Sequence, residues 1–322
     1  MRIHRMTRSA VPLHAWLILG AALVAVSSAG AVLQIIEGVP PILKASWRLQ
    51  ATSVLLLPFA IMQWKKMDEE SRQRFTEQRN LGILVGSGIC LFLHFGLWVW
   101  SLDHTTLTHS LLFVTAHPLV FVVGLALLGR PLHVRQSFGA VIGFIGVAFT
   151  LIGAGGDGEV TLLGDLAAFG GAIAIVGYLA AGRTLRSWMP LFVYAFPVTA
   201  IGAILLTIAS MGIEGSAFSS VDTNLSVFGW MDPIWLPAVL YLAIGPGLVG
   251  HTGINAVLRW ISPVVISVSV MIEPILGTVI GMILGTATAP DPWTWFGGGL
   301  ILLGIYGVTT ATGQKISADA EE

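Results

Sequence analysis

Two ionisable side chains stand directly before a proline in the middle of long apolar stretches. Glu273 precedes Pro274, and His117 precedes Pro118 at an offset of 156 residues. Burial in hydrocarbon disfavours the charged form of a carboxylate, which suits a group that takes up and releases a proton. Histidine titrates near neutral pH and can relay protons. Both are candidates for handling a proton or a substrate. The alternative is structural, with Glu273 protonated and bonded across a helix bundle and His117 satisfied in a core.

Arg48 is the third candidate for handling a substrate or a proton. It lies seven residues into an apolar stretch that begins at residue 41. Its side chain either reaches back to the membrane surface, as long basic side chains do, or faces the interior and attracts an anionic group such as a carboxylate. Lys44, one turn earlier, is predicted at the membrane surface.

A further group of polar and aromatic residues is predicted to line a cavity: Trp98, Thr115, Tyr178, His94, His251 and Asn255. The two histidines of this group each begin a His-x-Gly element, and no cysteine or carboxylate cluster accompanies them. Helix packing or interhelical hydrogen bonding is therefore the preferred interpretation of both. No metal site and no cofactor are predicted.

Helix breaks are predicted at three prolines. Gly245-Pro246-Gly247 places a proline between two glycines and should kink or locally unwind its helix. Pro118 and Pro274 have no amide hydrogen, so each leaves the carbonyl of the fourth residue before it without its usual helical donor. Because transporter sites are often built at such breaks, these five residues are hinge candidates.

Long apolar segments must position these residues. The chain is 55% hydrophobic and only 10% charged, with a mean hydropathy of +0.84, whereas soluble domains carry about 25% charged residues. Segments of about 20 apolar residues match the thickness of a bilayer and must be helical there. The sequence predicts an all-α polytopic membrane protein with ten spans, at 13–34, 41–64, 81–102, 107–128, 134–154, 163–186, 190–211, 235–256, 262–284 and 293–312.

The basic residues are predicted to lie on one side of the membrane. Fourteen of the 16 Lys and Arg residues fall on one side of the ten spans, and the other two are Lys44 and Arg48. Loops on the opposite side carry only acids: Glu37, Asp103, Asp157, Glu159, Glu214, Asp222, Asp232 and Asp291. Basic loops stay cytoplasmic during insertion, so both termini are predicted in the cytoplasm. We expect a plasma membrane rather than an organelle membrane.

An internal repeat divides the chain. Leu128-Gly129 matches Leu284-Gly285 at the same offset as the two prolines, and His94-Phe95-Gly96 matches His251-Thr252-Gly253. The repeat unit is five spans, and an odd number turns the second copy upside down. The predicted parts are a cytoplasmic segment 1–12, a first repeat 13–154, an external linker 155–162, a second repeat 163–312 and a cytoplasmic tail 313–322.

These patterns resemble the drug/metabolite transporter superfamily, and within it the EamA-type ten-span transporters. The resemblance rests on the Arg48 region, the stretch from Ser110 to Gly129, the opening of the sixth span at Leu163-Gly164-Asp165, and the run from Tyr241 through Glu273-Pro274 to Phe296-Gly297-Gly298. It implies two inverted five-helix repeats around a central cavity and transport of small organic metabolites. His117 departs from the expected family pattern, so no role is carried over to it.

The predicted function is a secondary carrier that exports or exchanges a small, amino-acid-like or weakly polar solute by alternating access. Coupling to protons and a homodimer are left open. A channel-like or uniporter facilitator is the alternative, with an intramembrane enzyme or a scaffold behind it. No nucleophile or intramembrane aspartate-pair motif supports an enzyme, and no basic patch outside the cytoplasmic loops indicates nucleic acid. The expected partners are a small-molecule substrate and the lipid bilayer.

Overall fold

The computed structural model describes residues 11–127, 129, 134–153, 160–257, 260–261, 266 and 269–318. Over this part of the chain the protein is all-helical, with 81% helix and no strand. A single isolated bridge joins Ala217 to Ser226. The all-α class predicted from composition is therefore confirmed.

The helix bounds follow the predicted spans closely. In chain order the helices are α1 (Leu13–Ser27), α2 (Ala29–Ile35), α3 (Pro41–Lys66), α4 (Glu69–Thr76), α5 (Gln78–Leu102), α6 (Leu107–Val114), α7 (His117–Leu127), α8 (Val134–Gly153), α9 (Leu162–Leu185), α10 (Leu191–Ile213), η1 (Thr223–Leu225), η2 (Gly229–Met231), α11 (Leu236–Leu242), the π-helix η3 (Ala243–Thr252), α12 (Gly253–Val257), α14 (Glu273–Leu284) and α15 (Pro292–Ala318).

Six helical segments of the described chain are long and apolar enough to cross a membrane: Leu13–Ile35, Gln78–Leu102, Leu107–Gly124, Leu162–Leu185, Leu191–Ile213 and Leu236–Val257. Val134–Thr150 and Glu273–Leu284 are shorter apolar helices. The chain is therefore an integral, multi-pass membrane protein.

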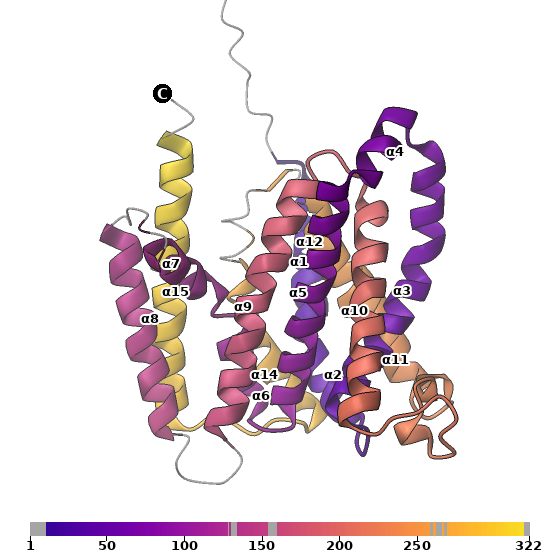
Figure 1. Ribbon diagram of the computed structural model, residues 1–322. Helices are drawn as coiled ribbons and strands as arrows, with labels where there is room; N and C mark the ends of the chain where they lie inside the picture. The colour runs from indigo at the N-terminus through magenta and orange to yellow at the C-terminus, as the bar shows by residue number, and fades with distance from the viewer. Residues whose placement is uncertain are drawn as a thin grey trace, which may run out of the picture.

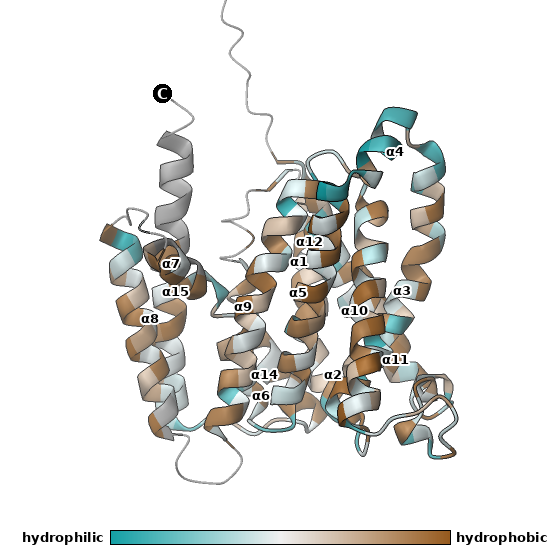
Figure 2. Ribbon diagram, in the orientation of Figure 1, coloured by the Kyte–Doolittle hydropathy of each residue, from teal (hydrophilic) through white to brown (hydrophobic). Residues whose placement is uncertain are grey.

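The two ends of the bundle differ in charge: the segment 65–79 at one end holds five basic and four acidic residues, whereas the charged residues of the segment 214–235 at the other end are the acids Glu214, Asp222 and Asp232. The polar helix α4 lies at one end, and the segment 214–235 with η1 and η2 lies at the other (Figures 1 and 2). At the α4 end the Arg74 guanidinium lies 4.6 Å from the Trp188 ring, which joins two basic segments. At the other end the Glu214 carboxylate accepts hydrogen bonds from the first amides of α3. We call these the basic end and the acidic end.

Lys44 corrects one expectation from the sequence. Instead of extending to the membrane surface, its ammonium lies 2.9 Å from an Asp103 carboxylate oxygen, and its side chain is 6% exposed. Asp103 caps the C-terminal end of α5. An ion pair can hold a buried ammonium because the partner charge offsets its lost hydration. Lys44 therefore ties α3 to α5 at the acidic end.

Glycines allow several helices to approach closely. A Cβ added at Gly146 of α8 would lie 2.6 Å from the Gly297 carbonyl of α15, and one added at Gly304 would lie 2.5 Å from the Gly139 carbonyl. Small residues at a helix interface let two backbones approach this closely. Such backbone contact tolerates no side chain, so α8 and α15 form a tightly packed pair at one side of the bundle (Figure 1).

The predicted helix breaks take three forms. α6 ends at Val114, and α7 begins at His117 after a two-residue turn. α14 begins at Glu273, again directly after a turn. Gly245-Pro246-Gly247 lies within the π-helix, so this segment widens and stays helical instead of unwinding. A π-helical turn accommodates the missing amide of Pro246 by shifting the hydrogen-bond register by one residue.

Candidate functional site

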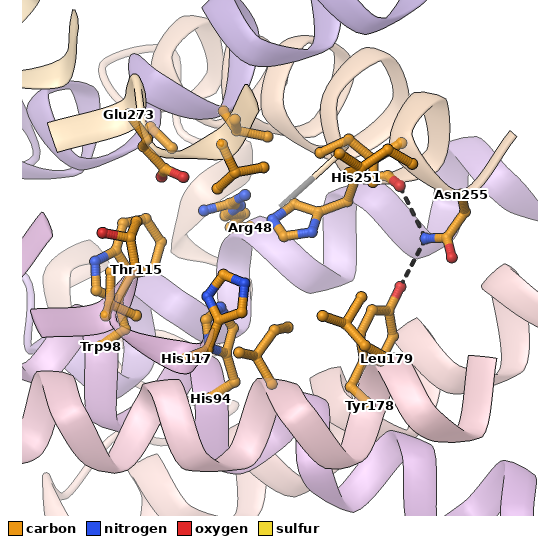
Figure 3. A pocket seen from close by; sticks show the side chains of 17 residues that line it. Arg48, His94, Trp98, Thr115, His117, Tyr178, Leu179, His251, Asn255 and Glu273 are labelled. Atoms are coloured by element: carbon orange, nitrogen blue, oxygen red, sulfur yellow. Dashed lines mark hydrogen bonds between the residues drawn. The ribbon is translucent and has the colours of Figure 1, made fainter. Parts of the chain in front are cut away.

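A cavity between the helices collects all nine side chains that the sequence predicted for substrate, proton or cavity-lining roles (Figure 3). Its volume is about 100 Å³, which suits a small solute or a few water molecules. Its lining comes from α1, α2, α3, α5, α6, α7, α9, the π-helix, α12 and α14. Helices from both halves of the chain therefore form it.

Arg48 points into this cavity from α3 and is 1% exposed. Its guanidinium carbon lies 4.4 Å from the centre of the Phe95 ring and 5.6 Å from the Trp98 ring, in a cation–π arrangement. Nε and Nη1 of Arg48 and Nε1 of Trp98 are buried without a hydrogen-bond partner among the described residues. The side chain thus faces the interior, and three donor nitrogens in this part of the cavity have no partner among the described residues.

Glu273 and His117 hold matching places on the two broken helices. Each is the first residue of its helix, α14 or α7, where unpaired amide groups create a positive partial charge. The His117 ring bonds the backbone of Val114, and so occupies the carbonyl that Pro118 was predicted to leave free. Glu273 and Arg48 attract one another across the cavity. They are not among the direct ion pairs of the described residues.

The remaining candidates lie in the same cavity and are mostly hydrogen-bonded. His94 Nδ1 lies 2.9 Å from the Gly171 carbonyl, which agrees with the interhelical bonding predicted for this residue. Asn255 donates to the Tyr178 hydroxyl over 3.0 Å and to the His251 carbonyl over 2.9 Å (Figure 3). The Thr115 hydroxyl donates back to a carbonyl of α6. These residues shape the cavity wall, while the unpaired donors belong to Arg48 and Trp98.

A second buried polar group lies at the acidic end and was not predicted. His109 of α6 and Asp165 of α9 are each 1% exposed, and His109 Nδ1 lies 3.0 Å from Asp165 Oδ2. The Thr105 hydroxyl donates to Asp165 Oδ1 over 2.7 Å. On the other side, His109 Nε2 lies 2.9 Å from the Thr294 hydroxyl of α15, which contacts Asp291 Oδ2. We call these five residues the acidic-end cluster.

The sequence contains a signal for this cluster. His109 and Asp165 lie two residues inside the predicted spans 107–128 and 163–186, at the ends that face the same side. Ionisable residues within a span are costly and usually find a partner. The residues predicted from the sequence were Glu273, His117, Arg48 and the cavity-lining group, so this pair was missed.

Taken together, the apolar helices define a polytopic membrane protein with a polar cavity between its helices. Residues 13–152 match the model of the EamA-like transporter family, which is part of the drug/metabolite transporter superfamily. This is a family of transporters and not of enzymes. A search of curated proteins gave no match.

Solved structures share the fold. Of 17 matching chains, one titled "Crystal structure of protein" superposes with a TM-score of 0.61 at 20% identity. The alignment covers 96% of this chain and 99% of that chain. At this identity the likeness concerns the fold alone.

Proposed function

We propose that the protein is a secondary carrier that moves a small organic solute across the membrane by alternating access. The observation that carries this proposal is the cavity itself, which both halves of the chain line and which holds a buried arginine whose Nε and Nη1 have no partner in the described part of the chain. Such donors are costly to bury unless a ligand satisfies them during part of the working cycle. A carrier supplies such a ligand, its substrate.

Inverted repeats and ten spans remain the proposed architecture. Two structural features support them. The helix breaks before His117-Pro118 and Glu273-Pro274 occur at the same offset as the sequence repeat. Gly129 and Gly285, at that offset too, have positive φ angles of 63° and 75°. Equivalent half-helices on opposite sides of a site are the usual basis for rocking one repeat against the other.

We further propose that the basic end faces the cytoplasm. This end carries Lys65, Lys66 and the arginines of α4 and its neighbours, and basic loops remain cytoplasmic. Both termini would then lie in the cytoplasm, and the acidic end would face outward. The predicted membrane remains the plasma membrane.

The cavity favours an amino-acid-like substrate. Arg48 and Trp98 present N–H donors for a carboxylate, and Glu273, which faces the same space, would accept a bond from an amino group. The volume of about 100 Å³ matches a small metabolite and not a nucleotide. Glu273 is also the candidate for proton coupling, because a carboxyl in this setting can carry a proton between the two faces.

Uptake and counterflow in proteoliposomes test the proposal. A panel of amino acids and related carboxylates is first ranked by thermal stabilisation of the purified protein, and the hits are assayed as radiolabelled substrates. A carrier shows saturable uptake, and unlabelled substrate inside the vesicles accelerates entry of label. Flux that rises linearly with concentration and shows no counterflow would instead establish the channel-like alternative.

A further inference from the structure

A neutral His109 ring has one N–H, but it contacts a polar partner in the acidic-end cluster through each of its two nitrogens. Asp291 is ionised near neutral pH. Partial burial tends to raise its pKa, but hydrogen bonds from the Thr294 hydroxyl and from the amides of Thr294 and Trp293 hold the pKa below its ordinary value of 3.8. An ionised carboxylate only accepts, so the Thr294 hydroxyl must donate to Asp291.

This direction of donation determines where the protons sit. Thr294 has one hydroxyl hydrogen and has given it to Asp291, so His109 Nε2 must carry a hydrogen to bond the Thr294 oxygen. The contact between His109 Nδ1 and Asp165 Oδ2 needs a second hydrogen, on the ring or on the carboxyl. The pair of His109 and Asp165 therefore holds two protons when all these hydrogen bonds are made.

The cluster joins separate parts of the chain at one end of the bundle. His109 belongs to α6 in the first half, whereas Asp165 of α9 and Thr294 of α15 belong to the second half. Nearby contacts join the same two halves, among them the bond between Thr108 and Thr278. A carrier that opens its cavity toward the acidic end must separate these elements. The exposed Asp291 gives protons from that face a route to the pair.

We propose that the His109–Asp165 pair is a proton-binding site that latches the acidic end of the bundle, holding it closed while protonated and releasing it when one proton leaves. The proposal rests on the proposed function, because a latch requires two conformations. Loss of the Nε2 proton would leave two acceptors, His109 and Asp291, competing for the single hydrogen of Thr294. The link from α6 to α15 could then be kept only by turning that hydrogen away from the ionised Asp291, which weakens the link.

Other charged and polar side chains also pack around α6. The charged groups that face His109 are Asp165 from α9 and Asp291 from the turn before α15. The other packed elements present neutral side chains that bond elsewhere, or charges that are already paired. These are Ser101 of α5 with Ser110, Thr278 of α14 with Thr108, Gln34 of α2 with the Leu102 carbonyl, Asp103 with Lys44, and His104 stacked on Trp100.

Cysteine labelling measures the latch directly. Cys90, the single cysteine of the chain, is replaced by alanine, and Val114, which lines the cavity, is replaced by cysteine. A membrane-impermeant maleimide is added to right-side-out and inside-out vesicles over about pH 5 to 8, the interval in which an unperturbed imidazole changes charge. Val221→Cys, on a residue that is 98% exposed, corrects for thiol reactivity at each pH.

The variants separate protonation from packing. Asp165→Asn keeps every hydrogen bond, since its amide nitrogen donates to Nδ1 and its oxygen accepts from Thr105, so it imitates the protonated pair permanently. Thr294→Val removes the bridge to Asp291, and Thr294→Ser restores it. His104→Gln alters a histidine at the same end outside the cluster.

We expect labelling from the acidic side to rise about tenfold with pH in the parent protein, in Thr294→Ser and in His104→Gln. Asp165→Asn should label slowly at every pH, and Thr294→Val rapidly at every pH. The latch is disproved if Asp165→Asn follows the parent curve or if Thr294→Val labels no faster at low pH. Labelling needs no substrate, so this result concerns the latch alone. If the parent protein showed no uptake of any solute, that result would count against the proposed function alone.

Discussion

The central cavity and the acidic-end cluster bury ionisable groups to the same extent but differ in whether those groups have hydrogen-bond partners. Arg48, His109 and Asp165 are each 1% exposed. In the cluster His109 and Asp165 have hydrogen-bond partners on both sides, whereas two nitrogens of Arg48 have none among the residues that the structure describes. Paired groups stabilise the resting structure, and unpaired donors are held ready for a ligand. The pairing, more than the burial, distinguishes the proposed latch from the proposed substrate site.

The largest stability effect is expected in the cluster. Asp165→Ala leaves the His109 ring and the Thr105 hydroxyl without their shared partner, so the free energy of unfolding should fall by about 2–4 kcal/mol. Denaturant titration in detergent measures this loss. Glu70→Ala, on the exposed polar helix α4, is the matched control and should change little. If the two variants were equally stable, the paired groups of the cluster would not stabilise the fold, and the contrast with the cavity would be lost.

Arg48→Met should reduce uptake without reducing stability. Uptake should fall by about 100-fold, because the substrate loses a charge-assisted bond at a desolvated site. The melting temperature should stay the same or rise, because an apolar chain of similar length replaces a buried charge without a direct partner. Lys44→Met is the control one turn away. It breaks the ion pair with Asp103 and should lower the melting temperature while uptake persists. A strongly destabilised Arg48→Met would mean that Arg48 is structural.

Glu273→Gln tests the second charge of the cavity. The amide keeps the shape of the side chain but cannot exchange a proton, so uptake should lose its dependence on a pH gradient, a change of several-fold at most. Counterflow at equal pH on both sides should continue. The measurement compares uptake with and without an imposed gradient, and an unchanged response would remove the proton role from Glu273.

Asp291→Asn should have the smallest effect on stability. Its lowered pKa means that ionised Asp291 stabilises the fold above the ordinary value of 3.8, and that this contribution disappears as pH falls through the lower folded value. Asp291→Asn should therefore cost less than about 1 kcal/mol at neutral pH, because solvent screens this exposed group. The difference between variant and parent should vanish in acid. Melting curves across pH show this directly, and a constant difference would contradict the assignment.

The cavity was largely predictable from the sequence. Hydrocarbon excludes polar side chains unless they have partners, so the few polar residues within the spans had to turn inward. Arg48, His117 and Glu273 indeed line one cavity. The acidic-end cluster was missed because its members stand near the ends of spans, where charged residues are common and attract little notice.

The sequence by itself determined the membrane class, the approximate bounds of the helices and the separation of charge, because bilayer thickness and the cost of polar groups in lipid act on each segment separately. Only the tertiary structure decided which residues meet. His109 pairs with groups 56 and 185 positions away, and Lys44 pairs with an aspartate 59 positions away. Such contacts depend on how each helix is rotated and how deeply it packs against its neighbours, and no local pattern in the chain specifies either.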